Sequence, residues 1–338
     1  MATLDHWHPV FLSKNLKKQP VRVVLDGMPI ALYRKKDGTA TALADECPHR
    51  RMRLSLGCVQ EDKLQCRYHG WTFTPDGNGE SPGTPKLHAC ITAYDVREEV
   101  GAIWVKAKGV EATFPSFNNP GYLPMGALQQ TVKAPLELVV DNFCEIEHTA
   151  TTHAVFGYEL DRMAEVEVRF LPTEDTVRVV NHGPAKTVSP WLRPLIGLQK
   201  GDQFHDDWTT YFSPVYSIYD HWWTNPQTGK EAKVRWRVYV FFTPVAERET
   251  QLCTFAYAKS TWHLGEYGGL RLFRWLMRRH LAREIQFDIN MLESLANYDT
   301  AIDGMKLSRF DRVLGLNRDR IDKIYRGKAP RSHKMGLA

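Results

Sequence analysis

Two cysteines and two histidines in two short loops constrain this sequence more than any other feature. One residue separates Cys47 from His49, two residues separate Cys66 from His69, and sixteen residues lie between the two pairs. Thiolates and imidazoles at such short spacings have few uses in proteins other than holding a metal. The pattern therefore predicts a metal centre with two sulfur and two nitrogen ligands.

The spacing helps to choose between two centres that use these ligands. In a Rieske-type [2Fe–2S] cluster two thiolates hold one iron and two imidazoles hold the other, which raises the reduction potential. A Cys₂His₂ zinc site uses the same ligands but places roughly two to four residues within each pair. The single residue between Cys47 and His49 favours the Rieske cluster, and a structural zinc site is the alternative.

Length and composition bound the kind of protein that this chain forms. Its 338 residues allow about two or three domains with sizeable cores. Hydrophobic residues make up 43% and charged residues 25%, which is typical of a globular protein. The net charge of +5 is spread along the sequence, so we expect no nucleic-acid binding. Because no apolar run could span a membrane and no signal segment is present, we expect no membrane contact and a cytoplasmic location.

Short strands separated by turn residues fill the first third of the chain. Val21–Leu25 and Pro29–Tyr33 flank Asp26-Gly27, which is a strong hairpin signal. Prolines, asparagines and a glycine between Pro115 and Pro124 mark a boundary. We therefore predict an all-β domain over residues 1–115, with the cluster loops at one end. Further strands are expected over residues 41–44, 72–74 and 101–105.

Residues 116–338 mix helices and strands and are expected to form a second domain. The segment from Leu136 to about Thr151 has few helix-breaking residues and predicts one helix. Residues 268–298 carry apolar side chains at helical spacing, with charges between them, and predict a long amphipathic helix. The chain is thus expected to be an α+β protein. The strands predicted for this part are residues 164–170, 176–181, 208–219, 233–243 and 251–260.

A second candidate metal site lies at the end of the first predicted helix. His148 and His153 are five residues apart there. Two imidazoles and one carboxylate on one face of Fe(II) leave open positions for O₂, as in non-haem iron oxygenases. A histidine pair alone is more often structural, but a one-electron carrier in the same chain favours a site that reduces O₂. We therefore predict a mononuclear iron at this pair.

The carboxylate ligand must come from another element, and the long C-terminal helix offers three. Asp288 lies mid-helix among apolar residues, where a carboxylate has to be paired, solvated or bound to a metal. Glu284 lies one turn earlier and is interpreted as a charge partner of the Arg278-Arg279 pair. Glu293 lies further along. We favour Asp288 as the third ligand.

These motifs together resemble the Rieske non-haem iron oxygenases, specifically the terminal oxygenase subunits of the homotrimeric class. That class includes the dicamba and vanillate O-demethylases, carbazole dioxygenase and the caffeine N-demethylases. The likeness spans nearly the whole chain, from the cluster loops to the helix that carries Asp288. It implies an N-terminal all-β Rieske domain and a C-terminal helix-grip domain with a curved antiparallel sheet.

The resemblance also implies roles for individual residues. Those that would hold the cluster are Cys47 and Cys66 on one iron and His49 and His69 on the other; those that would hold the mononuclear iron are His148, His153 and Asp288. Glu145 stands where the family usually has Asp, and it would connect the cluster histidine of a neighbouring subunit to His148. Asn142 would lie near the iron without binding it, and an ordinary helix-surface asparagine is the alternative.

Other basic and aromatic residues have open interpretations. Arg67 stands where the family usually has Pro and Arg51 where it usually has Gly, and both add positive charge to the cluster loops. A basic stretch is either a docking surface for an acidic electron donor or a solvated helix face; it contains Arg271, Arg274, Arg278, Arg279, His280 and Arg283. Tryptophans on predicted strands either pack in the core, which we favour, or line a substrate pocket; they are Trp208, Trp222, Trp223, Trp236 and Trp262.

The activity implied by the resemblance is hydroxylation, by mono- or dioxygenation, or oxidative demethylation of a small, aromatic substrate. The reaction would consume O₂ and electrons from NAD(P)H. The sequence shows no nucleotide- or flavin-binding fingerprint, so a separate flavin reductase, a ferredoxin or both would deliver those electrons. Electron transfer between subunits implies a head-to-tail ring, which the family's homotrimer provides. The alternative is an electron-transfer Rieske protein without oxygenase activity, which would not need the second metal site.

Overall fold

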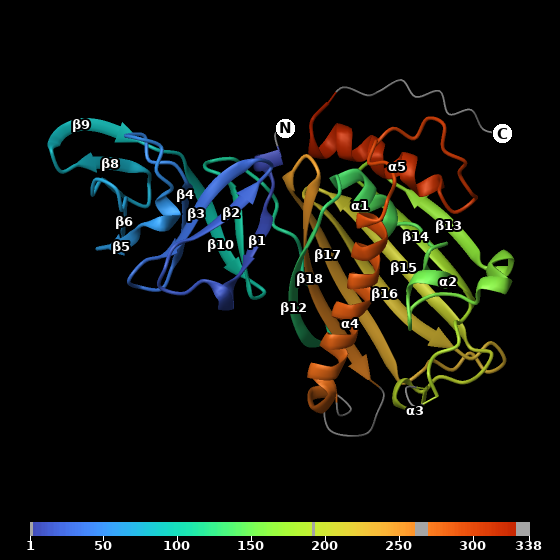
Figure 1. Cartoon of the computed structure of the whole chain (residues 1–338). Helices are drawn as coiled ribbons and strands as arrows, with labels where there is room; N and C mark the ends of the chain where they lie inside the picture. Colours follow the sequence, from blue (N-terminus) through green and yellow to red (C-terminus); the bar gives the residue numbers. More distant parts are fainter. Residues whose placement is uncertain (1–2, 191–192, 261–269, 329–338) are drawn as a thin grey trace.

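The computed structural model describes residues 3–190, 193–260 and 270–328. Three antiparallel sheets organise these residues (Figure 1). Two of the sheets belong to the first third of the chain, and the third sheet is covered on one face by helices. This arrangement confirms the predicted α+β class, with an all-β N-terminal part and a C-terminal part built on a large antiparallel sheet.

The first sheet has six strands and contains the predicted hairpin. Asp26 and Gly27 join its last two strands, and both have positive φ angles, 50° and 76°, as a two-residue hairpin turn requires. In spatial order the strands are β1 (His8–Leu12), β11 (Ala102–Ala107), β10 (Ala93–Glu99), β4 (Ala40–Ala44), β3 (Met28–Arg34) and β2 (Val21–Leu25).

The second sheet is small and carries the two cluster loops. One loop follows β4 and leads through a short helical turn, Leu54–Leu56, into the sheet, and the other joins its second and third strands. In Figure 1 this sheet forms the end of the molecule farthest from the helices. Its strands are β5 (Cys58–Gln60), β6 (Lys63–Gln65), β7 (Thr72–Phe73), β8 (Asn78–Ser81) and β9 (Thr84–Cys90).

The third sheet has seven strands, and one of its hairpins differs from the prediction. Residues 208–219 were expected to form one strand, but the chain turns at Ser213-Pro214 and makes two. Proline has no backbone N–H to give to a central ladder, so it marks this turn. In spatial order the strands are β12 (Leu123–Val132), β18 (Glu249–Ser260), β17 (Val234–Ala246), β16 (Val215–Thr224), β15 (Gln203–Phe212), β14 (Thr176–Pro184) and β13 (Glu167–Pro172).

Helices cover one face of the seven-stranded sheet. They are α1 (Leu136–Phe143), α2 (Thr149–Thr152), α3 (Arg193–Ile196), α4 (Leu270–Glu293) and α5 (Arg312–Arg320), with shorter helical turns at Leu160–Glu165 and Ile321–Tyr325. Figure 1 shows α1, α4 and α5 in front of the strands. The long helix α4 buries Leu281, Ile285, Ile289 and Leu292 in the core between the layers. Its predicted first residues, 268 and 269, lie outside the described part of the chain. None of the described helices is long and apolar enough to cross a membrane.

The single helix expected over residues 136–151 is wrong, because the chain breaks between α1 and α2. The side chain of Glu145 accepts hydrogen bonds from the backbone N–H groups of Glu147 and His148. A local acceptor of this kind competes with the helical carbonyls for the same amides. The chain therefore leaves α1 after Phe143 and begins α2 at Thr149.

An aromatic cluster joins the first sheet to the third. Trp104 of β11 is fully buried, and its ring stacks on Phe255 at 5.7 Å and meets Phe241 edge-on at 4.9 Å. The turn between β2 and β3 adds two backbone hydrogen bonds, in which the amides of Asp26 and Gly27 donate to carbonyls of β17 at 2.8 Å. The two halves of the chain thus share a packed interface, while the domain boundary at residues 115/116 stays a prediction.

Two buried histidines near the N-terminus contact the C-terminal end of the described chain. His6 is 2.9 Å from the Ser213 hydroxyl and 3.1 Å from the Tyr325 carbonyl, and its ring stacks on that of Tyr325. His8 is fully buried and donates to the Thr3 carbonyl at 2.9 Å. Burial lowers the pKa of His8 to about 3 because the charged imidazolium loses its hydration.

We expect acid to destabilise the protein through His8. An unfolded histidine takes up a proton near a pKa of about 6.5, whereas folded His8 does so only near 3, so the stability is complete above the first value and is lost as the pH falls towards the second. Between about pH 7.5 and pH 5 this one residue should remove about 2 kcal/mol. Urea unfolding of the wild type and of His8→Gln at both pH values measures this. A variant with the same acid sensitivity as the wild type would contradict the assignment.

Candidate functional site

Two tight turns present the four predicted cluster residues at one end of the small sheet. In the first, the Arg51 amide donates to the Cys47 carbonyl at 2.8 Å, and in the second the Gly70 amide donates to the Cys66 carbonyl at 3.1 Å. Gly70 has a φ angle of 72°, and Arg51 adopts the same left-handed region with a φ angle of 56°. The position where the resemblance implies Gly is therefore a backbone turn that favours Gly, and Arg51 occupies it under strain.

The cysteines and the histidines of these turns face different surroundings. Cys47 and Cys66 are 1% and 2% exposed, whereas His49 lies at the surface and stacks on Trp71. The rings of His49 and His69 lie 4.4 Å apart. Burial raises the pKa of the Cys47 thiol to about 11, so a thiolate here needs a metal to balance its charge. Two buried sulfurs below two outer imidazoles fit a [2Fe–2S] cluster whose histidine side faces solvent.

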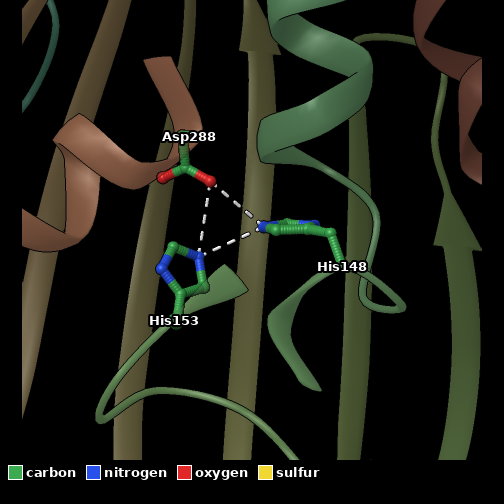
Figure 2. Close-up of side chains that lie close together, drawn as sticks. All are labelled: His148, His153 and Asp288. Carbon is green, nitrogen blue, oxygen red and sulfur yellow. Dashed lines mark hydrogen bonds and ion pairs between the residues drawn. The ribbon is translucent and has the colours of Figure 1, made fainter. Parts of the chain in front are cut away.

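Two separate segments of the chain bring together His148, His153 and Asp288, which we call the triad (Figure 2). His148 immediately precedes α2, His153 follows it, and Asp288 projects from α4. The two Nε2 atoms are 3.1 Å apart, and Oδ1 of Asp288 lies 3.2 Å from Nε2 of His148 and 3.4 Å from Nε2 of His153. An ion about 2.1 Å from three ligands at right angles separates those ligands by about 3.0 Å, so the triad fits a facial metal site.

Two acidic side chains and an amide surround the first histidine of the triad. Glu145 accepts from Nδ1 of His148, while Asp288 faces the opposite ring nitrogen. Burial alone would lower the pKa of His148, but hydrogen bonds to Asp288 and Glu145 raise it to about 10. The site therefore carries a surplus of negative charge that suits a cation. Asn142 donates to Oδ1 of Asp288 at 3.1 Å, so this predicted site residue contacts the triad.

Glu284 and Lys186 hold the second histidine. Glu284 is buried, its Oε2 lies 3.2 Å from Nδ1 of His153, and the same oxygen accepts from the Ala154 amide at 3.0 Å. The interpretation of Glu284 as a partner of the arginine pair on its own helix is thus wrong, because packing of α4 turns it towards His153. Lys186 donates to the carbonyls of Ala150, at 2.7 Å, and His153. No sequence signal identified Lys186, which belongs to a distant loop.

A buried ion pair anchors α1, the helix that precedes the triad. Asp141 of α1 pairs with Arg318 of α5, with an Oδ2 to Nε distance of 3.0 Å. Burial raises the pKa of Asp141 to about 6 despite the arginine. Sequence analysis missed this pair because its members lie far apart in the chain. It fixes the position of α1, and with it Asn142, the next residue.

An apolar cavity of about 700 Å³, counting the open space at its mouth, includes Glu284, the residue beside His153, in its wall. Its wall begins with Val155 and Phe156, which directly follow this part of the chain, and continues over α4 to Glu284. The remaining described lining residues are Ile196, Val234, Trp236, Ser260, Leu270, Phe273, Leu276, Met277, His280 and Leu281. An apolar cavity near a candidate metal site suits a small organic ligand.

The predicted tryptophans divide between the core and this cavity. Trp208, Trp223 and Trp236 are buried in the main core, and Trp236 also lines the cavity. Trp222 stacks on His205 at the opposite sheet face. Trp262 lies outside the described residues.

Four arginines in the basic stretch of α4 are exposed, namely Arg271, Arg274, Arg279 and Arg283. The role of this stretch in docking an electron donor stays a prediction.

Comparison with known sequences agrees with both sites. Residues 6–95 match the Rieske [2Fe-2S] domain, and residues 132–301, half of the chain, match the vanillate O-demethylase oxygenase C-terminal domain. The chain therefore belongs to the Rieske oxygenases whose catalytic half is of the vanillate O-demethylase type.

Individual relatives are more distant. The chain is 33% identical over 161 residues to the 4beta-methylsterol monooxygenase of Methylococcus capsulatus, covering 43% of this chain and 43% of that protein. It is 32% identical over 163 residues to the oxygenase component of dicamba O-demethylase from Stenotrophomonas maltophilia, covering 44% and 46%. The chain thus spans less than half of the length of the curated relatives it matches. A crystal structure of dicamba monooxygenase superposes with a TM-score of 0.79 at 19% identity, over 96% of this chain and 97% of that one, which establishes the shared fold.

Replacing Arg51 by Gly should stabilise the protein. Removing the side chain relieves the left-handed strain, and the gain exceeds the backbone entropy that Gly adds to the unfolded state, for a net stabilisation of about 0.5–1 kcal/mol. The side chain of Arg51 is 87% exposed and its nearest carboxylate lies 3.8 Å away, so little is lost with it. Denaturant unfolding compares the two proteins. A less stable Arg51→Gly protein would show that the arginine makes a contact that outweighs its strain.

Asp288→Ala should remove the mononuclear iron and leave the cluster. The change takes away the one carboxylate that faces both triad imidazoles, so we expect at least a tenfold loss of iron affinity. Metal analysis and the visible spectrum of the cluster measure the two sites separately. Glu293→Ala is the matched control, because Glu293 lies on the same helix but accepts from the Lys133 amide. Full iron retention in Asp288→Ala, or loss in the control, would place the ligand elsewhere.

Proposed function

We propose that this chain is a terminal oxygenase component, which receives electrons at its Rieske cluster and oxidises a small organic molecule in the cavity beside the triad. One observation carries the proposal: His148, His153 and Asp288 form a facial ligand set next to an apolar cavity. A pure electron carrier needs neither feature. The proposed products are a hydroxylated molecule or, after loss of a hydroxylated methyl group, a demethylated one.

The residues of the site have distinct parts in this proposal. His148, His153 and Asp288 would hold Fe(II), which, when bound there, supplies O₂ binding and activation. Asn142 orients the carboxylate of Asp288 through its hydrogen bond of 3.1 Å. Glu145 fixes the ring of His148 by accepting its Nδ1–H. A carboxylate on the outer nitrogen of a metal-bound histidine sets both its tautomer and its orientation.

Electron delivery supports an assembly of several copies. Figure 1 shows β6, which precedes the second cluster loop, and α2, which lies between the triad histidines, at opposite sides of the molecule. One chain therefore keeps its two candidate metal sites apart. A head-to-tail ring of copies would bring the cluster of one copy to the triad of the next, with Glu145 as the connection to His148. The homotrimer is the assembly that we propose, and a closed ring of this kind is a common symmetry.

An external donor would supply the electrons from NAD(P)H. The exposed rim around His49 is basic, which suits a flavin reductase or ferredoxin with an acidic docking face. The rim consists of Arg50, Arg51, Arg53 and Arg67. The two relatives described above are named as a monooxygenase and a demethylase, which favours mono-oxygenation or demethylation over dioxygenation. The cytoplasmic location stays a prediction.

A single-turnover experiment tests the proposed function. Protein with a reduced cluster and bound iron would meet O₂ together with methoxyarenes, methylated amines, aromatic acids or methylsterols. We expect one class to yield an oxidised or demethylated product, found by mass spectrometry, as the cluster absorption bleaches. Cluster oxidation without product from any ligand would instead support the electron carrier.

The variant Glu145→Gln tests, in the same single-turnover assay, whether electron transfer is lost while both metals stay bound. Glu145→Gln should keep both metal sites but slow product formation roughly 10- to 100-fold, because the neutral amide oxygen accepts the Nδ1–H of His148 more weakly than the charged carboxylate does. Asp288→Ala serves as the control that has a cluster and no product. Product formation at the wild-type rate in Glu145→Gln would remove Glu145 from the electron path.

A further inference from the structure

The first turns of α4 carry an exposed row of apolar and basic side chains. Leu272 is 84% exposed and Trp275 is 65% exposed. Arg279 and Arg283 continue the row at helical spacing and are exposed as well. We call these four residues the outer row. Single apolar side chains are common on protein surfaces, so the charges and the position of the row have to show what it contacts.

The charge of this part of α4 has one sign. Its first acidic residue is Glu284, and the fourteen residues before it include five arginines. Two of these arginines reach the edge strand β12, where Arg274 donates to the Met125 carbonyl at 3.0 Å and the Arg278 side chain lies beside Gly126. Strand β12 itself contains no charged residue. The start of α4 and the adjoining strand thus present positive charge, which suits an anionic partner.

The outer row lies on the same helical turns as much of the cavity wall. Leu270, Phe273, Leu276 and Met277 line the cavity, and they alternate along the helix with the residues of the outer row. Leu276 lies about one turn after the exposed Leu272. One side of these turns therefore faces the cavity and the other side faces water. A partner bound to the outer row would lie next to the cavity wall.

The position of the outer row argues against a protein that exchanges electrons. Figure 1 shows the start of α4 at the lower end of the molecule and the small sheet with the cluster loops at its left end. Asp288 of the triad lies thirteen residues after Trp275, which corresponds to about 20 Å along the helix. An electron donor has to approach the cluster, and a neighbouring copy has to bring its cluster to the triad. Both of those contacts are therefore centred elsewhere.

The surface of a phospholipid bilayer fits the row in polarity and in charge. Tryptophan and leucine side chains enter the boundary between headgroups and acyl chains, and arginines are attracted to anionic headgroups. The sequence predicts no membrane contact because no segment could cross a bilayer, but binding to the surface of a bilayer requires no such segment. Apolar molecules concentrate in the bilayer, so this contact would place the cavity wall beside a store of apolar ligand.

We propose that the outer row binds the surface of a membrane that contains anionic phospholipids. Leu272 and Trp275 enter the acyl-chain boundary, and Arg279 and Arg283 meet the phosphates. The contact holds the first turns of α4 at the bilayer, which makes an apolar, membrane-dissolved molecule the class of ligand nearest to the cavity. The assignment rests on the proposed function only in taking the cavity as the substrate site, because the membrane contact itself involves neither metal site.

Sedimentation with lipid vesicles tests the contact. The full chain, loaded with its metals, is mixed with vesicles of phosphatidylcholine and phosphatidylglycerol in equal parts, or with vesicles of phosphatidylcholine alone. We expect the mixed vesicles to bind the protein at least roughly tenfold more tightly than the neutral ones. Added salt should reduce this difference, because it screens the attraction between the arginines and the lipid charge.

Two variants separate the apolar part of the contact from the charged part. Leu272→Ser combined with Trp275→Ser should bind the mixed vesicles at least roughly tenfold more weakly, because it removes the apolar surface that leaves water. Arg279→Gln combined with Arg283→Gln should weaken binding roughly fivefold for each charge removed. Circular dichroism and sedimentation velocity check the fold and the oligomeric state of each variant.

A matched control lies on β13, the edge strand at the opposite side of the sheet from β12. Leu171→Ser combined with Arg169→Gln removes an exposed leucine and an exposed arginine there, and it should leave vesicle binding unchanged. Vesicles with brominated acyl chains then locate the contact, since bromine quenches the fluorescence of a nearby tryptophan. We expect stronger quenching in the wild type than in Trp275→Phe, which lacks the indole at the proposed contact.

Several outcomes would overturn the assignment. These are no binding to the mixed vesicles, equal binding to both kinds of vesicle, an equal loss in the β13 control, and equal quenching in the wild type and in Trp275→Phe. A changed oligomeric state in the outer-row variants would also overturn it and make the row a contact between copies. If the serine variant does not fold, the quenching comparison still decides.

The vesicle assay does not depend on turnover, so it is separate from the test of the proposed function. Vesicle binding through the outer row without any product would leave this assignment in place and remove the oxygenase activity. Product formation without vesicle binding would do the reverse.

Discussion

The pairing of buried carboxylates with two imidazoles is the interaction on which the catalytic half depends. Asp288 and Glu284 lie one turn apart on α4, and they face opposite nitrogens of His153. Both carboxylates are nearly inaccessible to water, so burying either one destabilises the fold unless a cation or a hydrogen-bond donor contacts it. Docking of α4 on the sheet and assembly of the triad are therefore one event. A metal in the triad would stabilise this docking, because binding free energy to a folded site adds to folding free energy.

The break between α1 and α2 is as necessary to the site as the docking of α4. A continuous helix would place His148 and His153 more than one turn apart on its surface, pointing in different directions. Glu145 prevents this by capturing the amides of Glu147 and His148, and the same carboxylate also holds the His148 ring. Lys186 then fixes the other end of α2 by binding its last carbonyls. Two charged side chains thus shape the short segment that carries both histidines.

Sequence analysis succeeded where local chemistry decides the structure. The hairpin follows from its turn residues Asp26-Gly27, and the spacing of the cluster loops agrees with the match to the Rieske domain. The three predicted triad residues lie together, while their role as iron ligands stays a prediction. Sequence analysis failed where contacts between distant segments decide the structure. The partner of Glu284 depends on which face of α4 meets the sheet, and Lys186 and Arg318 act across long stretches of chain. The segment over residues 136–151, expected to be one helix, has few helix-breaking residues, and its break comes from a side-chain hydrogen bond that composition does not reveal.

The long helix α4 connects the triad to the cavity. One of its faces supplies Asp288 to the triad, and the preceding turns supply much of the cavity wall, ending with Glu284. A substitution in the exposed or apolar positions of the first turns changes the cavity without reaching the triad, since Asp288 lies at least one turn beyond every lining residue of α4. Glu284 is the exception, because it contacts His153 and the cavity together. Substitutions in the early turns of α4 can thus reshape the cavity alone, whereas a substitution at Glu284 also acts on a histidine of the triad.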